Sequence, residues 1–209
     1  MLARVKSSNM KNLVYITIIF FGLHSSLKAQ SIFFGIKAGP QYSDLIGDPG
    51  DGIPRLGFHF GFVMEVEIYE QFSFQSELLY SSQGSEGFLF NEDVKLNYLN
   101  LPLMAKYYVI NDFSIEAGAQ VGWLLSAKTE ENDETFDIAP VLNNLDTSLV
   151  FGLGYKIDNG IHFGVRYNYG LTNTGLNYQP IIRNSVLQFS VGYFFTPSGS
   201  KLQTSNSAE

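Results

Sequence analysis

The sequence has 209 residues, no cysteine and a single tryptophan. Without cysteine it forms neither a disulfide nor a thiolate metal site, although this absence leaves the cellular compartment open. Its longest apolar run, residues 13–23, is shorter than the roughly 20 residues that a transmembrane helix needs. No stretch shows the repeat of an amphipathic helix. Disulfide scaffolds and thiolate metalloproteins are therefore excluded, and a protein that spans the membrane with several helices is disfavoured.

The first thirty residues have the pattern of a secretory signal peptide. Lys11 and Asn12 precede the apolar run, and the small residue Ala29 lies close to its end. We expect cleavage near Ala29 or Gln30, with Met10 as the natural initiator; an uncleaved anchor helix is the alternative. The predicted organisation is a signal peptide over residues 1–30, a folded domain over 31–195 and a disordered periplasmic tail over 196–209.

Basic residues are scarce once the signal peptide is removed. Residues 1–30 hold four of the 13 basic residues and none of the 20 acidic ones, so the mature chain has nine basic and 20 acidic residues, a net charge of −11. Such a chain cannot neutralise many phosphates, which excludes nucleic acid as a partner.

Aromatic residues and glycine are abundant, with 18 Phe, 12 Tyr and 20 Gly. Residues 55–69, RLGFHFGFVMEVEIY, show how they are arranged. Alternate positions carry an unbroken apolar series that includes Phe58, Phe60 and Phe62, whereas the positions between them carry Glu65, glycines and other polar residues. Only a β-strand, with its period of two, separates these sets onto two faces.

The same alternation recurs along the chain, which predicts strands over residues 32–42, 55–69, 72–80, 94–110, 113–126, 145–157, 161–171 and 183–195. Pro102 cannot donate to a ladder, so we expect a bulge or local irregularity there. Polar segments, among them residues 83–93 and 128–144, make the connections alternate between long and short. Eight strands with this alternation are typical of a transmembrane β-barrel with short periplasmic turns, long external loops and both termini in the periplasm.

A soluble barrel of lipocalin type would place the apolar face inside. The polar face is instead rich in Gly and Ser, as a narrow lumen requires, and the apolar face is too bulky for an eight-stranded interior. We therefore predict an all-β, eight-stranded antiparallel up-and-down barrel with a lipid-facing apolar exterior and a polar, plugged lumen. Aromatic residues near strand ends are candidates for interfacial girdles: Tyr80, Tyr98, Tyr107, Trp123, Tyr155, Tyr169 and Tyr193.

Residues 98–107, YLNLPLMAKY, resemble the Y-L-x-[IL]-P-[LM]-x-x-K-[YF] signature of the PorT-like outer-membrane β-barrel family. Residues 35–39, GIKAG, look like its opening G-x-K-x-G, and residues 166–171, RYNYGL, are similar to its penultimate-strand motif. The resemblance implies an eight-stranded barrel in the outer membrane of a Gram-negative type of cell. It implies little about activity, although a few members serve in protein-secretion machinery. Such barrels often end at the final aromatic, whereas this chain continues past Phe195.

Nine charged residues on the inward face are the candidate site: Lys37, Arg55, Glu65, Glu67, Glu77, Lys106, Glu116, Lys156 and Arg166. Five cations and four anions nearly balance, which favours a structural network of buried ion pairs, because lone charges there would be costly. A conduction path or a proton relay is the alternative, although eight strands leave an interior just wide enough for side chains.

The sequence gives no sign of an active site, a cofactor or a metal centre. His59 and His162 lie on the inward face, where hydrogen-bonded interior histidines are the simpler interpretation, and no G-x-S-x-G, H-E-x-x-H or phosphate-loop motif is present. We therefore predict that the protein is not an enzyme; a Ser, His and Asp site at the rim is the less favoured alternative.

Two predicted external loops are acidic, one with Asp44, Asp48 and Asp51 and the other with a longer series: Glu130, Glu131, Asp133, Glu134 and Asp137. Their spacing matches no calcium loop, so a solvated surface is favoured over Ca²⁺ binding or Ca²⁺ bridges to lipopolysaccharide. Two functions remain open. One is a structural or interaction barrel with outer-membrane lipid and an envelope protein as partners, as in a secretion machine. The other is a small transport or surface-adhesion barrel that acts through these loops.

Overall fold

The computed structural model describes residues 31–47, 52–89, 92–110, 112–131, 134–157, 159–175 and 181–195. The predicted signal peptide and the predicted tail lie outside these ranges. Within them, no helix is both long enough and apolar enough to cross a membrane.

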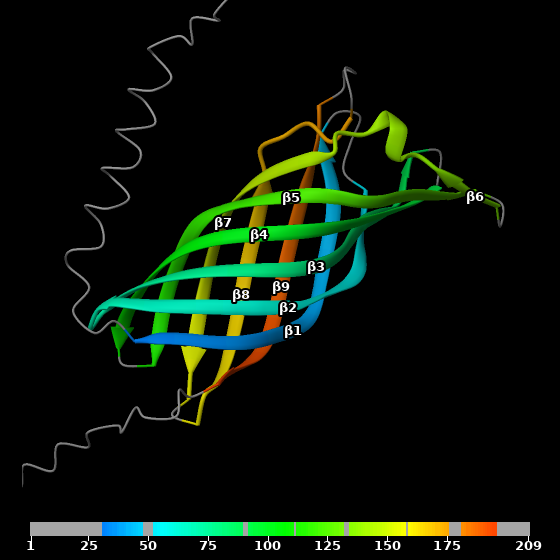
Figure 1. Ribbon diagram of the computed structural model, residues 1–209. Helices are drawn as coiled ribbons and strands as arrows, with labels where there is room; N and C mark the ends of the chain where they lie inside the picture. The colour runs from blue at the N-terminus through cyan, green and yellow to red at the C-terminus, as the bar shows by residue number, and fades with distance from the viewer. Residues whose placement is uncertain are drawn as a thin grey trace, which may run out of the picture. The chain divides into compact units, whose positions relative to one another are not determined.

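Eight long antiparallel strands close into a barrel (Figure 1). Each strand pairs with its neighbour along the chain, and β1 pairs with β9 to close the sheet. The prediction of an eight-stranded up-and-down barrel is therefore confirmed. Its strands are β1 (Ile32–Gly47), β2 (Ile53–Tyr69), β3 (Phe72–Leu89), β4 (Glu92–Ile110), β5 (Phe113–Glu131), β7 (Leu145–Lys156), β8 (Ile161–Gly170) and β9 (Ile182–Phe195).

Several strands run further than the alternation of apolar residues predicts. Residues 83–89, expected in a polar linker, continue β3, and residues 128–131, expected in an acidic loop, continue β5. The short strand β6 (Glu134–Asp137) folds back on this end of β5 and leads to a 3-10 turn, η2 (Ala139–Val141) (Figure 1). The apolar alternation stops where a strand leaves the lipid, but the ladder of backbone hydrogen bonds does not.

The apolar face of the strands points outward, as predicted. Phe62 and Phe60 are 67% and 51% exposed, whereas Glu65 on the same strand is fully buried in the lumen. This arrangement is the reverse of a soluble protein, in which large apolar side chains would be buried. It suits lipid as the surrounding solvent, since closure of the sheet also pairs the backbone groups that hydrocarbon cannot satisfy.

One detail of the prediction is wrong, the girdle position of Tyr98, and the irregularity expected at Pro102 is a gap in the ladder and not a bulge. Tyr98 is buried inside the barrel and not in a girdle, because it has the same parity along β4 as the inward residues Asn100 and Pro102. There is no bulge at Pro102, because β4 keeps the same register with β3 on both sides of it. Leu101 and Pro102 themselves form no pair with β3. The missing amide of proline is accommodated by a gap in one ladder.

Candidate functional site

Six of the nine predicted charges meet in the lumen, and each comes from a different strand. Lys37 lies on β1, Glu65 on β2, Glu77 on β3, Lys106 on β4, Glu116 on β5 and Arg166 on β8. Each of the six is at most 4% exposed. Three cations and three anions make this group neutral, and we call it the lumen network.

The contacts form one continuous series of alternating charge. Lys37 Nζ lies 3.1 Å from Glu77 Oε2, and Glu77 Oε1 lies 2.7 Å from Arg166 Nη1. On the other side, Arg166 Nη2 and Nε both lie 2.7 Å from Glu116 Oε2. Lys106 Nζ lies 3.4 Å from Glu116 Oε1 and 3.0 Å from Glu65 Oε2, so it links these two carboxylates.

The contact between Glu77 and Arg166 spans the barrel. In the order of strands around the sheet, β3 and β8 are four places apart among eight, so they face each other across the lumen. Charge-assisted hydrogen bonds of this length are among the stronger polar contacts in proteins. The network therefore forms a crossbar between opposite walls.

Neutral side chains complete the network. Gln75 donates to Glu77 and accepts a hydrogen bond of 2.9 Å from Lys106 Nζ, which closes the series into a ring. The hydroxyl of Tyr108 donates to Glu65 Oε1 at 2.6 Å. The space left among the network and its neighbours is a cavity of about 10 Å³, room for one water at most.

Glycines on β7 give the network its room. Gly152 pairs with Glu116 on one side and with Arg166 on the other, so their side chains meet above it. A Cβ at Gly152 would clash with Arg166 Cγ, and one at Gly154 would clash with Glu116 Oε1. Here the glycine-rich inward face, which suggested a narrow lumen, has a specific function.

The other three predicted charges lie outside the network. Arg55, near the loop end of β2, donates at 2.8 Å to the carbonyl oxygen of Gln83. Glu67 lies near the turn end and is only half-buried. Lys156 Nζ lies over the ring of Phe33, 4.1 Å from its centroid, in a cation–π contact. The nine charges therefore do not form a single network, because these three lie near strand ends, where Arg55 and Lys156 contact other groups.

Both histidines are buried in the lumen, as predicted. His59 Nε2 lies 2.9 Å from Ser190 Oγ, and the ring of His162 stacks on Phe194 with 4.4 Å between centroids. His162 is not the hydrogen-bonded interior histidine that was expected, because neither ring nitrogen has a partner among the described residues. Stacking, and not hydrogen bonding, holds its ring.

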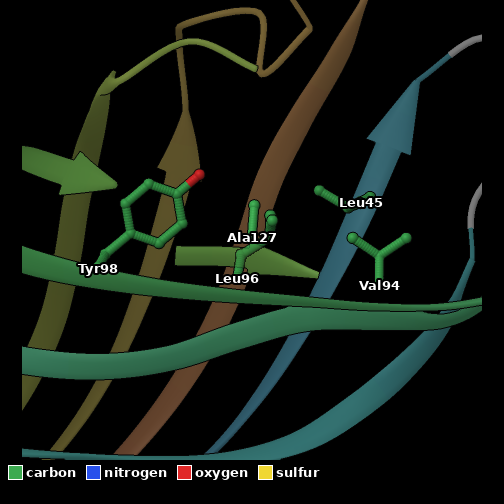
Figure 2. Packing of buried hydrophobic residues seen from close by; sticks show 5 residues of the cluster. All are labelled: Leu45, Val94, Leu96, Tyr98 and Ala127. Atoms are coloured by element: carbon green, nitrogen blue, oxygen red, sulfur yellow. The ribbon is translucent and has the colours of Figure 1, made fainter. Parts of the chain in front are cut away.

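An apolar cluster, which the sequence did not lead us to predict, lies between the polar lumen and the loops. It consists of Leu45, Val94, Leu96, Tyr98 and Ala127, from β1, β4 and β5 (Figure 2). Partly buried side chains from the β5–β7 connection, Ile138 and Leu142 among them, pack against it. The signal was present, because Val94 and Leu96 share the inward parity of Asn100. The lumen is therefore blocked by two layers, one of charge and one of hydrocarbon.

A closed barrel with an apolar exterior and an internally paired polar lumen defines a transmembrane β-barrel of the outer membrane. The match to a family model agrees: residues 28–175 match the outer membrane protein beta-barrel domain, and the chain belongs to that family. It accordingly belongs in the outer membrane of a Gram-negative type of envelope.

Solved structures share the fold at low sequence identity. Neisserial surface protein A matches 80% of this chain and 100% of its own, with a TM-score of 0.57 and 14% identity. Ail of Yersinia pestis, in a complex with the heparin analogue sucrose octasulfate, matches 79% of this chain and 99% of its own, with a TM-score of 0.50 and 16% identity. No curated protein sequence matches the chain.

Proposed function

We propose that this protein is an outer-membrane barrel of the interaction type, which binds an envelope protein and does not pass solutes through its lumen. The observation that carries the proposal is the contact between Glu77 and Arg166, 2.7 Å long, from opposite walls of the lumen. Displacing it would leave charges buried without partners, and such a break typically costs about 3–5 kcal/mol. With a closed lumen, a partner would bind at one of the two ends of the barrel.

The end with the short turns is the proposed periplasmic end. Residues 70–71, between β2 and β3, lie there together with Ile32 and Phe195, because Phe34 pairs with Phe195 where β1 and β9 close the barrel. Barrels of bacterial outer membranes have short turns in the periplasm and longer loops outside. By that rule both ends of the barrel domain face the periplasm.

The resemblance of residues 98–107 to the PorT-like signature supports a role as a subunit of a secretion or envelope machine. Most of that motif lies in the wall: Leu99, Leu101 and Leu103 turn outward, while Asn100 and Lys106 are buried in the lumen. The motif therefore describes how β4 is built into the barrel, and the contacts to a partner are expected from the turns and loops.

Cross-linking in native outer membranes, followed by capture in mild detergent, tests the proposal. We expect one envelope protein to be recovered in stoichiometric amount. The β2–β3 turn and the β5–β6 hairpin are then the segments to substitute, with the outward-facing Val165 on β8 as a control position in the wall. Recovery of the barrel alone, after efficient cross-linking of a known envelope complex in the same sample, would contradict the proposal.

Conductance across a planar lipid bilayer tests the closed lumen separately. We expect the parent protein to show no large, stable current steps. Arg166→Ala should lower the resistance to unfolding without opening a channel, because the apolar cluster still closes the loop end. Large, stable steps in the parent protein would contradict a closed lumen and favour transport.

Surface adhesion through the loop end is the second candidate, favoured by the strands that extend past the lipid-facing band. Ail was crystallised with the heparin analogue sucrose octasulfate, but acidic residues at the loop end of this chain would repel such an anion. Of the residues expected in acidic loops, Asp44 lies on β1 and Asp137 on β6. An adhesion partner would need a basic surface. Binding of the folded barrel to cationic but not to anionic beads, lost at high salt, would support this candidate.

We also propose that the protein is not an enzyme. His59 and Ser190, the histidine and serine that lie in hydrogen-bond contact, are both buried inside the lumen. A substrate would have to displace either the lumen network or the apolar cluster to reach them. Failure of a serine-directed fluorophosphonate probe to label the folded barrel is the expected result, and labelling that His59→Ala abolishes would contradict it.

A further inference from the structure

Two neighbouring hairpins at the proposed periplasmic end carry the most exposed large apolar side chains among the described residues. Tyr69, where β2 ends, is 75% exposed, and Ile110, where β4 ends, is 69% exposed. Each directly precedes the two residues that connect its strand to the next, a place where small and polar residues are usual. Contacts within the barrel therefore do not explain why these two tips are apolar.

A β-bulge lies just before each of these turns. The register with the neighbouring strand shifts by one residue before Tyr69 in β2 and before Ile110 in β4. The extra residues are Ile68 and Val109, which are 39% and 50% exposed. A bulge interrupts the regular alternation of side chains between the two faces of a strand, so each hairpin carries two successive exposed apolar residues near its tip. We call these four residues the turn patch.

The turn patch lies beyond the lipid-facing band of β4, and its two halves are joined. Tyr107 is the girdle candidate on this strand, and Ile110 comes three residues later, up to about 10 Å further along the strand at roughly 3.3 Å per residue. The hydroxyl of Tyr107 donates to Gln71 Oε1 at 3.1 Å, and the amide of Tyr108 donates to the carbonyl oxygen of Gln71 at 2.8 Å. These bonds fix the first hairpin against the second.

The residues that flank the turn patch are acidic. Residues 67–72 and 108–115 contain Glu67, Glu70 and Asp112 and no basic residue. Glu70 is exposed, and the other two are partly buried. Segments that rest in a membrane interface combine aromatic residues with Lys or Arg, so an acidic rim does not suit a lipid surface. An apolar centre with a polar rim is instead the composition of a protein–protein interface.

We propose that the turn patch is the docking site for an envelope protein whose own contact surface is apolar at its centre and basic at its rim. This inference rests on the proposed function and names the surface that makes the contact. Tyr69 is the anchor, because buried aromatic side chains contribute most to the affinity of such interfaces. Basic residues of the partner face Glu70 and Asp112, which selects the partner and speeds its association. Because the two hairpins are already joined, little of the patch has to become ordered on binding.

Cysteine labelling tests the site, because the chain has no cysteine of its own. Ile110→Cys places a thiol in the turn patch, and Asn159→Cys places one on the exposed β7–β8 turn at the same end as a control. Each variant is treated with a water-soluble maleimide in two preparations that are open on both faces. One is the purified barrel in nanodiscs of phosphatidylethanolamine and phosphatidylglycerol, and the other is fragments of native outer membrane. We expect Ile110→Cys to react in nanodiscs and to lose most of its labelling in native membranes, while Asn159→Cys reacts in both.

Charge reversal tests the chemistry of the partner. Glu70→Lys and Asp112→Lys, added together to Ile110→Cys, should restore labelling in native membranes, because the new lysines repel a basic rim. The labelling of the same triple variant in nanodiscs is the reference, which corrects for any effect of the lysines on the thiol itself. Protection that survives the charge reversal would overturn a basic partner.

The other outcomes separate this site from the proposed function. Protection of Ile110→Cys already in nanodiscs would place the turn patch in lipid and overturn the site, as would equal labelling in both preparations. If an envelope protein is cross-linked to the barrel while Ile110→Cys stays reactive, the proposed function stands and its partner binds elsewhere. If no partner is recovered and the thiol stays reactive, both proposals fail. Should Ile110→Cys not fold, as judged by gel mobility before and after boiling, Tyr69→Cys decides in the same way.

Discussion

Replacement of Arg166 by methionine tests the lumen network most directly. Methionine approximates the length and volume of the aliphatic part of arginine, so the change removes charge and hydrogen bonds with little loss of packing. Arg166 donates to Glu77 and to Glu116, each at 2.7 Å. The variant therefore keeps three buried carboxylates and only two cations.

The expected loss can be worked out from the contacts that remain. Breaking a buried pair costs about 3–5 kcal/mol, mostly because a charge is left without a partner. Lys37 still lies 3.1 Å from Glu77, and Lys106 still lies 3.4 Å from Glu116. The two carboxylates therefore share one missing charge, and we expect the unfolding free energy to fall by about 3–5 kcal/mol and not by twice that amount.

Urea unfolding of the barrel in lipid vesicles provides the measurement. Trp123 is the only tryptophan and lies outward, 41% exposed, so its fluorescence reports the transfer of the wall out of the lipid. Adding Glu116→Gln to the variant leaves two complete pairs, Lys37 with Glu77 and Lys106 with Glu65. The double variant should recover about 1–2 kcal/mol. A single-variant loss below about 1 kcal/mol, or purely additive losses, would refute this account of the network.

Three further predictions concern other layers of the barrel. Gly152→Ala should destabilise the barrel by about 1–3 kcal/mol through overpacking. Gly164→Ala on the neighbouring strand should not, because a Cβ there would meet nothing nearer than 3.8 Å. The midpoints of urea unfolding of the two variants test this difference. Leu96→Ala, at a fully buried position of the apolar cluster, should lower the unfolding free energy by about 2–5 kcal/mol. Amide hydrogen exchange should become faster only at the loop end of β4. Faster exchange along the whole barrel would argue against a separate cluster. Phe62→Lys should cost about 2–4 kcal/mol for a lysine at the bilayer midplane. Val141→Lys, exposed outside the wall, should fold into vesicles like the parent. Equal yields of folded barrel for the two variants would contradict a lipid-facing β2.

The sequence predicts the wall of this barrel better than its interior. Period-two alternation defines which side of each strand faces lipid, because a strand has only two faces and lipid accepts only one kind of side chain. The pairing of charges inside depends on register and on closure of the sheet. Glu77 and Arg166 are 89 residues apart, and nothing local to either residue indicates the other.

The loop end was predicted least well, for a physical reason. Above the lipid, a strand meets water or other protein on both sides, so its sequence need not alternate, and residues 83–89 resemble a linker although they continue β3. Tyr98 was assigned to the lipid interface by its residue type, but its parity along β4 places it inside. The parity of a position along its strand is thus a better guide than amino-acid preference.

The lumen network also has a consequence for how the barrel acquires its strand pairing. A slip of two residues keeps every apolar side chain facing lipid, so the hydrophobic pattern alone does not reject it. Such a slip would place Gln75 or Leu79 where Glu77 now meets Arg166, and the buried guanidinium would lose that counter-charge. The charges come from six strands spread between Lys37 and Arg166, so they are all matched only when the sheet closes. A barrel closed in a shifted register would therefore keep unbalanced charge inside the membrane, a cost that the apolar wall alone would not impose.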